Sequence, residues 1–260
     1  MDLKIISSEH IEAFDKSINS SIDSELERLT KIDTPVDYFD FYRSISSVYS
    51  SRIEGVSIEY DSFFKHKFLG VKFKPDYTKR TDDLFAAYQF IDKKEISLET
   101  VCKVHNLLFA NILPKTERGK VRKNPMLVIN NEEKIEYVAA DPALISSELV
   151  SFFLDVEYLT KERLSISEVF YYAAYIHLVF VKIHPFQDGN GRTGRLLEKW
   201  FLQLKLGEKV ASIQLEKHYY LNLASYYKNL RKLGLEYDVL DYSKCLDFLL
   251  MTVNSLNKMK

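Results

Sequence analysis

The segment IHPFQDGNGRTGR occupies residues 183–195, between two helical patterns at 166–183 and 191–205. Its glycine-rich half is therefore expected to be a loop that delivers the chain into the N-terminus of the second helix. Backbone N–H groups in the first turn of a helix are unpaired, and the positive end of the helix dipole lies there. The segment therefore predicts an anion site.

Five residues of this segment suit a polyphosphate. Gly189 and Gly191 let the backbone approach a phosphate closely and adopt a positive φ. Asn190 adds a side-chain amide donor. Arg192 and Arg195 are three residues apart, so their planar guanidinium groups lie on neighbouring rows of one helix face and can grip a polyphosphate. Two arginines directly behind Gly-Asn-Gly indicate a site for a nucleotide or another phosphate compound.

Two further residues of the segment carry reactive groups. Asp188 offers a hard oxygen ligand for Mg²⁺, which proteins usually hold with one or two carboxylates plus substrate phosphates. His184 ends the preceding helix, where it can accept a proton from an incoming hydroxyl near neutral pH. Pro185 and Phe186 are expected to pack and fix the loop. A base, a metal ligand and a phosphate site within one short segment predict phosphoryl or nucleotidyl transfer.

Elsewhere, apolar residues recur at three- and four-residue spacing, which predicts an all-α fold. Ser165 with Glu168 forms a capping box, and Asp141 before Pro142 provides an N-cap followed by proline at the first helical position. The expected helices lie at about 9–30, 36–54, 59–67, 80–93, 97–111, 142–159, 166–183, 191–205, 216–232 and 238–257.

One segment departs from the helical pattern. Residues 126–129 and 135–138 are short β-rich runs around a polar turn, which predicts a hairpin. A lone hairpin is marginally stable in water, so this one must lean on the helices or wait for a partner strand.

The composition excludes several classes of protein. Of 260 residues, 46% are hydrophobic and 28% charged, with 8 glycines and 6 prolines, so disordered and collagen-like chains are excluded. The net charge of −1 provides no overall positive field for nucleic acid or a membrane surface. The basic cluster at 118–123 is interpreted as a solvated loop, with an anion or nucleic-acid contact as the alternative.

The location of the protein is also suggested by its sequence. Cys102 and Cys245 lie far apart without C-x-x-C spacing, which favours a reduced, intracellular chain. The apolar stretch from Val169 to Val181 is shorter than the ~20 residues that cross a bilayer, so a buried core helix is expected. The N-terminus lacks a long apolar run, and a cytoplasmic location is therefore expected.

Residues His184 to Arg195 resemble the motif H-P-F-x-[DE]-G-N-G-R-x-x-R of the Fic family at every specified position. This resemblance implies an all-α Fic core with a small β-hairpin flap, and transfer of AMP from Mg²⁺-ATP to a hydroxyl side chain of a target protein, a reaction called AMPylation. It implies that His184 is the general base and that Asp188 holds Mg²⁺. It further implies an anion hole and phosphate contacts, made by Gly189, Asn190, Gly191, Arg192 and Arg195.

A second resemblance lies upstream, at Ser50-Ser51-Arg52-Ile53-Glu54-Gly55, which is similar to the inhibitory signature [ST]-x-x-x-E-[GN] of Fic proteins. Ser50 and Glu54 share one helical face, and Gly55 suits a helix C-terminus. A carboxylate that reached Arg195 would occupy the guanidinium fork that otherwise holds the γ-phosphate. The resemblance therefore implies an enzyme that is held inactive by Glu54.

The chain is divided on this basis into three regions: 1–75 with the inhibitory motif at 50–55, a catalytic core at 76–232 with the flap at 124–138, and a C-terminal helix at 233–260. The flap is expected to position a segment of the target protein by strand addition. The resemblance also implies that the chain itself is an acceptor of AMP and that it forms a homodimer.

Five aromatic and imidazole side chains are not assigned to the site. Tyr219, Tyr220, Tyr226 and Tyr227 follow the core helix, where relatives often contact adenine, but a core role is expected. His177 lies on the same helix as His184, and packing or a hydrogen bond is expected because no third metal ligand is near.

Three alternatives to AMP transfer remain open. The site could remove AMP, with Glu54 helping to activate a water molecule. It could use another donor that contains a diphosphate, because the loop recognises phosphates and not the base. It could also bind a nucleotide as a sensor without catalysis, although His184 argues against this because binding alone needs no base.

Overall fold

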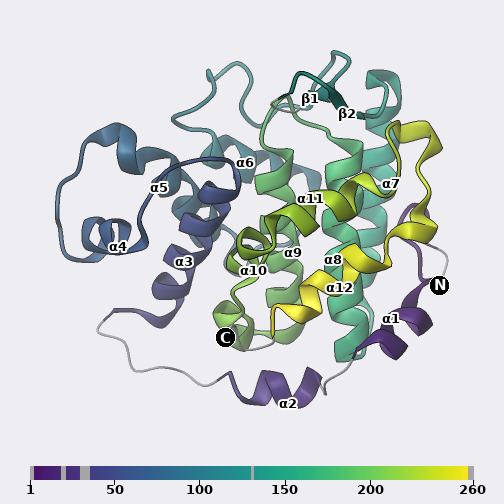
Figure 1. The fold of residues 1–260 in the computed structure, drawn as a ribbon, viewed down its shortest axis with the longest axis horizontal. Coiled ribbons are helices and arrows are strands. Elements are labelled where there is room, and N and C mark those ends of the chain that lie inside the picture. Colours follow the sequence, from purple (N-terminus) through teal and green to yellow (C-terminus); the bar gives the residue numbers. More distant parts are fainter. Residues whose placement is uncertain (1–2, 19–21, 30–35, 130–131, 257–260) are drawn as a thin grey trace.

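The structure is a computed structural model that describes residues 3–18, 22–29, 36–129 and 132–256. Helices dominate it, and one two-stranded antiparallel sheet lies at one end (Figure 1). The elements are α1 (Ile11–Ser17), α2 (Ile22–Glu27), α3 (Tyr38–Ile53), α4 (Tyr60–Phe68), α5 (Pro75–Phe90), α6 (Leu98–Leu108), β1 (Leu127–Ile129), β2 (Ile135–Val138), α7 (Pro142–Lys161), α8 (Ile166–Ile183), α9 (Asn190–Leu206), α10 (Leu215–Leu221), α11 (Leu223–Arg231) and α12 (Leu246–Asn254), with 3₁₀ turns η1 (Glu208–Ser212), η2 (Tyr237–Val239) and η3 (Tyr242–Lys244). The predicted all-α fold with a hairpin is confirmed.

Helix α8 is the centre of the molecule and contacts α7, α9 and α12 (Figure 1). Its predicted capping box is present, because the Ser165 hydroxyl accepts from the Glu168 N–H and the Glu168 carboxylate accepts from the Ser165 N–H. Among the described residues, α8 alone is long and apolar enough to cross a membrane, and 83% of that stretch is buried inside the molecule. The helix is thus a core helix, as its apolar run predicted.

Four predicted helices differ from the observed ones. The helix expected at 80–93 is α5, which already starts at Pro75, a residue suited to the first turn of a helix. The helix expected at 216–232 is two helices, because Asn222 leaves helical geometry and its side-chain amide donates to the His218 carbonyl. The helix expected at 238–257 starts at Leu246, after turns in which the Asp241 side chain accepts from the Ser243 N–H. The helix expected at 9–30 is replaced by α1 and α2; residues 19–21 and 30 lie outside the described part, as does residue 257.

A single large hydrophobic cluster extends from Ile6 to Leu256 and contains buried residues of α1, α7, α8, α9 and α12. A smaller cluster of Val48, Ile58, Phe63 and Phe85 lies between α3, α4 and α5. The N-terminal, central and C-terminal regions therefore share one core, which fixes α3 relative to α8 and α9.

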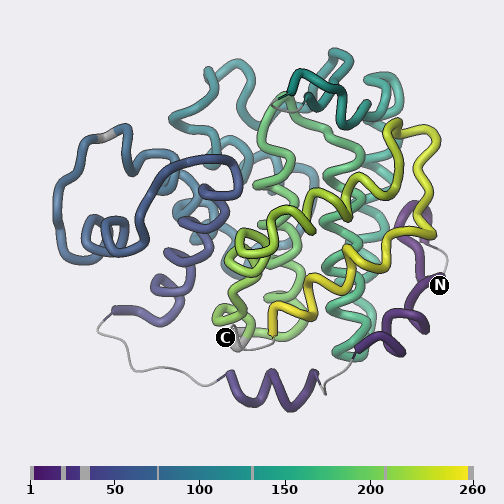
Figure 2. Tube along the Cα trace, in the orientation of Figure 1, coloured from purple at the N-terminus to yellow at the C-terminus, as the bar shows by residue number. Residues whose placement is uncertain are grey.

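The hairpin lies against the segment that follows α11. β1 and β2 pair in antiparallel register, and the Val138 N–H donates to the Leu235 carbonyl at 2.8 Å. Arg231 at the end of α11 pairs with Glu136 of β2 at 2.9 Å. The chain after α11 passes near the hairpin before it returns along the molecule as α12 (Figure 2). The hairpin thus leans on neighbouring structure, as its marginal stability predicted; residues 130–131 of its turn lie outside the described part.

Candidate active site

A cavity of about 340 Å³ lies where α3, α8, α9, α11 and the hairpin meet. Its walls include most of the residues predicted from the sequence together with several from the hairpin and α11: Glu54, Leu127, Val128, Glu136, Tyr137, Val181, Lys182, His184, Asp188, Gly189, Asn190, Gly191, Arg195, Tyr226, Tyr227, Leu230 and Arg231.

His184 ends α8 in a left-handed conformation, with φ 56° and ψ 56°. Pro185 follows and has no N–H with which to continue the helix. The Nδ1 atom of His184 lies 3.1 Å from the Val181 carbonyl oxygen, which can only accept, so the neutral ring carries its proton on Nδ1. Burial lowers the pKa of His184 to about 4. Nε2 is therefore left as an unprotonated acceptor in a residue that lines the cavity.

Arg122 fixes the backbone of this histidine. Its guanidinium donates to the carbonyls of His184 at 2.7 Å, Asn124 at 2.7 Å and Ala140 at 2.6 Å, and its side chain is buried. A cation at this position also opposes the negative end of the α8 dipole. The interpretation of the whole cluster 118–123 as a solvated loop is therefore wrong for Arg122, because carbonyl groups at the end of α8 need its donors.

Asn190 has a different role from the one predicted. Its side-chain amide donates to the Phe186 carbonyl at 2.8 Å and accepts from the Phe186 N–H at 2.9 Å, and the residue is 1% exposed. Both ends of the amide are thus used to hold the loop closed. Phe186 is buried and stacks on His105, which confirms the packing role predicted for it.

The loop before α9 is further fixed by His105. Its Nδ1 accepts from the Gly119 N–H at 2.8 Å, so its Nε2 carries the proton and donates to the Asp188 carbonyl at 2.9 Å. Gly189 has a φ of +78°, and a Cβ atom there would lie 1.9 Å from the Phe109 ring. Only glycine fits this point, and no side chain caps the first turn of α9. The helix N-terminus therefore faces the cavity uncovered by a capping side chain.

Arg195 extends from α9 toward α3 and is 1% exposed. Its Nη2 lies 2.7 Å from Glu54 Oε1 and 3.3 Å from the Ser50 carbonyl oxygen, and its Nε lies 3.1 Å from Ser50 Oγ. The structure thus brings together two segments that are 141 residues apart in sequence. The predicted meeting of Glu54, Ser50 and Arg195 is present.

Charge at this contact is well matched. Burial opposes ionisation of Glu54, but the positive charges of Arg195 and Arg192 outweigh it and lower the pKa of the carboxyl group. A Cβ atom on Gly191 would lie 3.1 Å from Glu54 Oε1 and 3.2 Å from Arg195 Nη1. Gly191 therefore leaves the space in which the carboxylate and the guanidinium meet.

Arg192 does not join Arg195 at the cavity wall. Its guanidinium lies 4.3 Å from the centre of the Phe109 ring and 3.7 Å from Asp188 Oδ1. Its Nε is buried without a hydrogen-bond partner among the described residues. The two arginines predicted to form one clamp thus have different surroundings, because α9 directs residues 192 and 195 toward α6 and α3, respectively.

Asp188 is the candidate ligand for a metal ion. Its side chain is 49% exposed, lines the cavity and accepts from the Gly189 N–H at 2.6 Å. In the described part of the chain, no three His, Cys, Asp or Glu side chains are grouped as a metal cage would require. A single accessible carboxylate beside a phosphate site nevertheless fits Mg²⁺, which takes few protein ligands and completes its shell with phosphate oxygens and water.

The aromatic residues after α9 divide between cavity and core. Tyr226 and Tyr227 line the cavity, whereas Tyr219 is fully buried and is not part of its wall. Tyr220 contacts Tyr49 of α3. His177 lies between Tyr226, at 3.1 Å, and Glu198, at 2.7 Å, so the hydrogen-bonded role expected for it is confirmed.

Four residues that shape the site are not predicted as site residues from the sequence: His105 and Lys182, for which no role is predicted, Arg122, which is placed in a solvated loop, and Tyr226, which is placed in the core. Each acts through a contact with a residue far away in sequence, and no local pattern marks such contacts. Lys182 lines the cavity with its ammonium 4.2 Å from the centre of the Tyr137 ring, and burial lowers its pKa to about 8. The one sequence signal for Lys182 is its position, since a lysine two residues before His184 lies in an otherwise apolar helix.

Taken together, the fold and the cavity define a helical protein with a neutral histidine beside an uncapped helix N-terminus. Residues 95–202, which contain this loop, α8 and most of α9, match the sequence model of the Fic/DOC family. This part of the chain is therefore a Fic domain.

Solved structures support the same fold. A Fic family protein from Desulfovibrio desulfuricans G20 superposes with a TM-score of 0.76 at 19% identity, over 98% of this chain and 74% of that one. A signaling protein with a Fic domain from Bacteroides thetaiotaomicron VPI-5482 superposes with a TM-score of 0.68 at 17% identity, over 90% of this chain and 92% of that one.

Curated relatives carry an activity in their names. "Protein adenylyltransferase Fic" of Drosophila persimilis is 33% identical over 107 residues, which are 41% of this chain and 19% of that protein. "Protein adenylyltransferase fic-1" of Caenorhabditis briggsae is 31% identical over 103 residues, 40% of this chain and 18% of that protein. The chain thus matches about a fifth of the length of these relatives.

Proposed function

We propose that this protein is an adenylyltransferase that transfers AMP from Mg²⁺-ATP to a hydroxyl side chain of a target protein, and that Glu54 inhibits it. The observation that carries the proposal is that His184 presents an unprotonated Nε2 in the same cavity as the Arg195 guanidinium and the N-terminus of α9. A site that only bound a nucleotide would not need this base. The names of the matching relatives support the same reaction.

Each residue has a defined part in the proposed reaction. The hydroxyl oxygen of the target attacks the α-phosphorus of ATP, the bond to pyrophosphate breaks, and the hydroxyl proton passes to Nε2 of His184. The backbone N–H groups of Asn190 and Gly191 stabilise negative charge on the phosphate oxygens, whereas the N–H of Gly189 donates to Asp188, and Arg195 binds the outer phosphates. Asp188 would hold Mg²⁺, which neutralises charge on the phosphates when it is bound.

Inhibition follows from the position of Glu54. The carboxylate pairs with Arg195 at 2.7 Å, so a γ-phosphate and Glu54 compete for the same guanidinium. ATP that cannot reach Arg195 is not held for in-line attack, and small misplacements of a reacting group are costly to the rate. Release requires Glu54 to leave, either by movement of the end of α3 or by displacement of its side chain.

The hairpin is proposed to hold the target segment. Leu127, Ile129 and Ile135 are each 45–56% exposed, although they are apolar, and Leu127 also lines the cavity. An extended segment of the target could add to the hairpin by main-chain hydrogen bonds and place its hydroxyl near His184.

The direct test is AMP transfer by purified variants, measured by intact-protein mass spectrometry after incubation with Mg²⁺-ATP. We expect AMP adducts on the chain itself for Glu54→Gly, few or none for the wild type, and none for Glu54→Gly/His184→Ala. Glu59→Gly is the matched control, because Glu59 lies in the same region and pairs with Arg52 instead of Arg195. Adducts on the wild type and the Glu59→Gly variant equal to those on Glu54→Gly would contradict inhibition by Glu54.

The same samples separate the alternatives. ATP binding by Glu54→Gly without adducts on the chain or on proteins of a cell extract would favour a nucleotide-sensing module. Adducts that form only with another nucleoside diphosphate or triphosphate compound would identify a different donor. Loss of AMP from a modified protein that depends on Glu54 would favour AMP removal as the main activity.

A further inference from the structure

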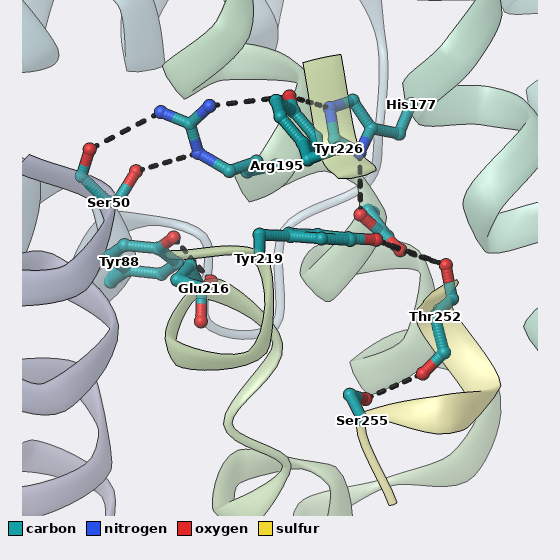
Figure 3. Close-up of polar contacts among 10 residues, drawn as sticks. Ser50, Tyr88, His177, Arg195, Glu216, Tyr219, Tyr226, Thr252 and Ser255 are labelled. Atoms are coloured by element: carbon teal, nitrogen blue, oxygen red, sulfur yellow. Dashed lines mark hydrogen bonds and ion pairs between the residues drawn. The ribbon is translucent and has the colours of Figure 1, made fainter. Parts of the chain in front are cut away.

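A chain of hydrogen bonds runs from Arg195 into the core (Figure 3). Arg195 Nη1 lies 3.4 Å from the Tyr226 hydroxyl, which lies 3.1 Å from Nε2 of His177. Nδ1 of His177 lies 2.7 Å from Oε2 of Glu198. All four side chains are at most 1% exposed, so water does not replace any of these contacts.

The donors and acceptors fix the direction of this chain. A guanidinium only donates, so the Tyr226 oxygen accepts from Arg195, and its own proton can be donated to Nε2 of His177. A carboxylate oxygen only accepts, so Nδ1 of His177 donates to Glu198. The hydroxyl of Tyr226 is thus held between Arg195 and His177, and His177 is held in turn by Glu198.

Glu198 is itself held from two further elements. Its Oε1 accepts from the Tyr219 hydroxyl of α10 at 2.6 Å and from the Thr252 hydroxyl of α12. Glu198 and Arg195 belong to the same helix, α9, and are separated by one turn. The chain of contacts thus starts and ends on α9 and passes through α11 and α8, which gives Tyr226 a fixed position.

The partners of Arg195 fall into two groups. Ser50 and Glu54 belong to α3 and its C-terminus, and both contacts are lost together if this helix end moves away. Tyr226 belongs to α11 and does not depend on α3. A guanidinium without these partners would be free to change its rotamer. ATP binding would then have to order the side chain again, and this entropy cost would raise the Kd.

We propose that Tyr226, oriented by His177 and Glu198, is a positioning residue that keeps Arg195 directed into the cavity after Glu54 has left. This inference rests on the proposed function, because it assumes that Arg195 then binds the phosphates of ATP. In the released state, Tyr226 holds the Arg195 guanidinium in the position that binds ATP. In the inhibited state, Ser50 and Glu54 contact the same guanidinium.

The test is the Kd of Mg²⁺-ATP, measured by isothermal titration calorimetry on Glu54→Gly and on double variants that also carry Tyr226→Phe, His177→Asn or Tyr88→Phe. Tyr226→Phe removes the hydroxyl between Arg195 and His177. His177→Asn removes the ring nitrogen that contacts Tyr226. Tyr88→Phe is the matched control, because Tyr88 is also a buried tyrosine whose hydroxyl donates to a buried glutamate, but that glutamate is Glu216 and not Glu198.

We expect Tyr226→Phe to raise the Kd about tenfold, since a hydrogen bond to a charged group is lost. His177→Asn should raise it less, by about threefold, and Tyr88→Phe should leave it within about twofold. Circular dichroism and thermal melts show whether each variant is folded.

Two results would overturn the inference. An unchanged Kd for folded Tyr226→Phe would show that Arg195 needs no support from this hydroxyl. A raised Kd for Tyr226→Phe together with an unchanged Kd for His177→Asn would show that Tyr226 contacts ATP directly and is not part of a chain. Failure of the Glu54→Gly parent to bind ATP would instead contradict the proposed function.

Discussion

His184 shows how one residue acquires the properties of a base from its backbone. The left-handed conformation turns Nδ1 back to the Val181 carbonyl, and burial keeps the ring neutral. An exposed histidine changes from mostly neutral to mostly protonated as the pH falls below its ordinary pKa of about 6.5. The environment of His184 moves that change to more acidic pH and thereby keeps the imidazole neutral, which is the form that the proposed reaction needs.

The pH dependence of AMP transfer tests this point. Because the pKa of His184 is lowered to about 4, the base stays neutral well below pH 6.5. The transfer rate of Glu54→Gly at saturating ATP should therefore stay nearly constant between about pH 8 and pH 6. Initial rates across this range, scored by the mass of the AMP adduct, check it. A decline with a midpoint near pH 6.5 would mean that His184 ionises normally.

A substitution at Gly189 tests whether the Phe109 ring leaves room for a side chain at the start of α9. In Gly189→Ala the new Cβ would lie 1.9 Å from the Phe109 ring, and the φ of +78° adds strain. Gly207→Ala is the matched control, since its φ is +74° and no atom lies within 4 Å. The control should lose about 1 kcal/mol of unfolding free energy, and Gly189→Ala about 2 kcal/mol more. Chemical denaturation measures both; equal losses would refute the clash.

At the scale of elements, the end of α8 depends on a residue from a loop. Arg122 donates to the carbonyl groups of His184, Asn124 and Ala140. It thereby connects the end of α8 to the segments just before and just after the hairpin. A helix C-terminus that is buried needs such donors. His184 is therefore positioned jointly by α8 and by the loop before the hairpin.

Arg122→Met tests this dependence. The change leaves buried carbonyl groups without donors, so unfolding free energy should fall by about 2 kcal/mol or more. Transfer by the Glu54→Gly form should fall as well, because the backbone of His184 is no longer fixed. Lys123→Met is the control, since Lys123 is exposed. Denaturation curves and adduct yields are the measurements, and an Arg122→Met protein as stable and active as the control would contradict this role.

The elements also show what sequence patterns can and cannot predict. Caps at Ser165 and Asp141 predict helix starts well, because a cap bonds within its own first turn. The break at Asn222 was missed, since one asparagine in an apolar pattern is common in helices. The predicted role of Asn190 as a donor to phosphate is wrong, because sequence spacing does not reveal whether a side-chain amide bonds to its own loop or to a ligand. The meeting of Glu54 with Arg195 was anticipated only through a family resemblance, since periodicity contains no information on contacts between distant helices.

At the scale of the whole molecule, the shared core couples the site to global stability. His105 is buried and His184 is half-buried beside the loop, and loss of hydration lowers the pKa of each to about 4. In the unfolded chain each would have a pKa of about 6.5. Between these values the unfolded chain binds protons that the folded protein does not, so acid favours unfolding.

The unfolding free energy should therefore fall as pH decreases from about 6.5 to 4, by a few kcal/mol in total. Thermal melts at about pH 7 and pH 5 measure the trend. His105→Gln should be less stable at pH 7 but should show a weaker dependence on pH, because one of the two groups is gone. A midpoint that is the same at both pH values would exclude neutral burial of these histidines.

The carboxylate that occupies Arg195 belongs to the same polypeptide, 141 residues away. A tethered inhibitor has an effective concentration set by the fold, and dilution or expression level does not alter it. Under the proposed inhibition by Glu54, a higher amount of the protein would therefore not by itself release Arg195. Activation would instead shift the equilibrium between the paired and the released position of Glu54.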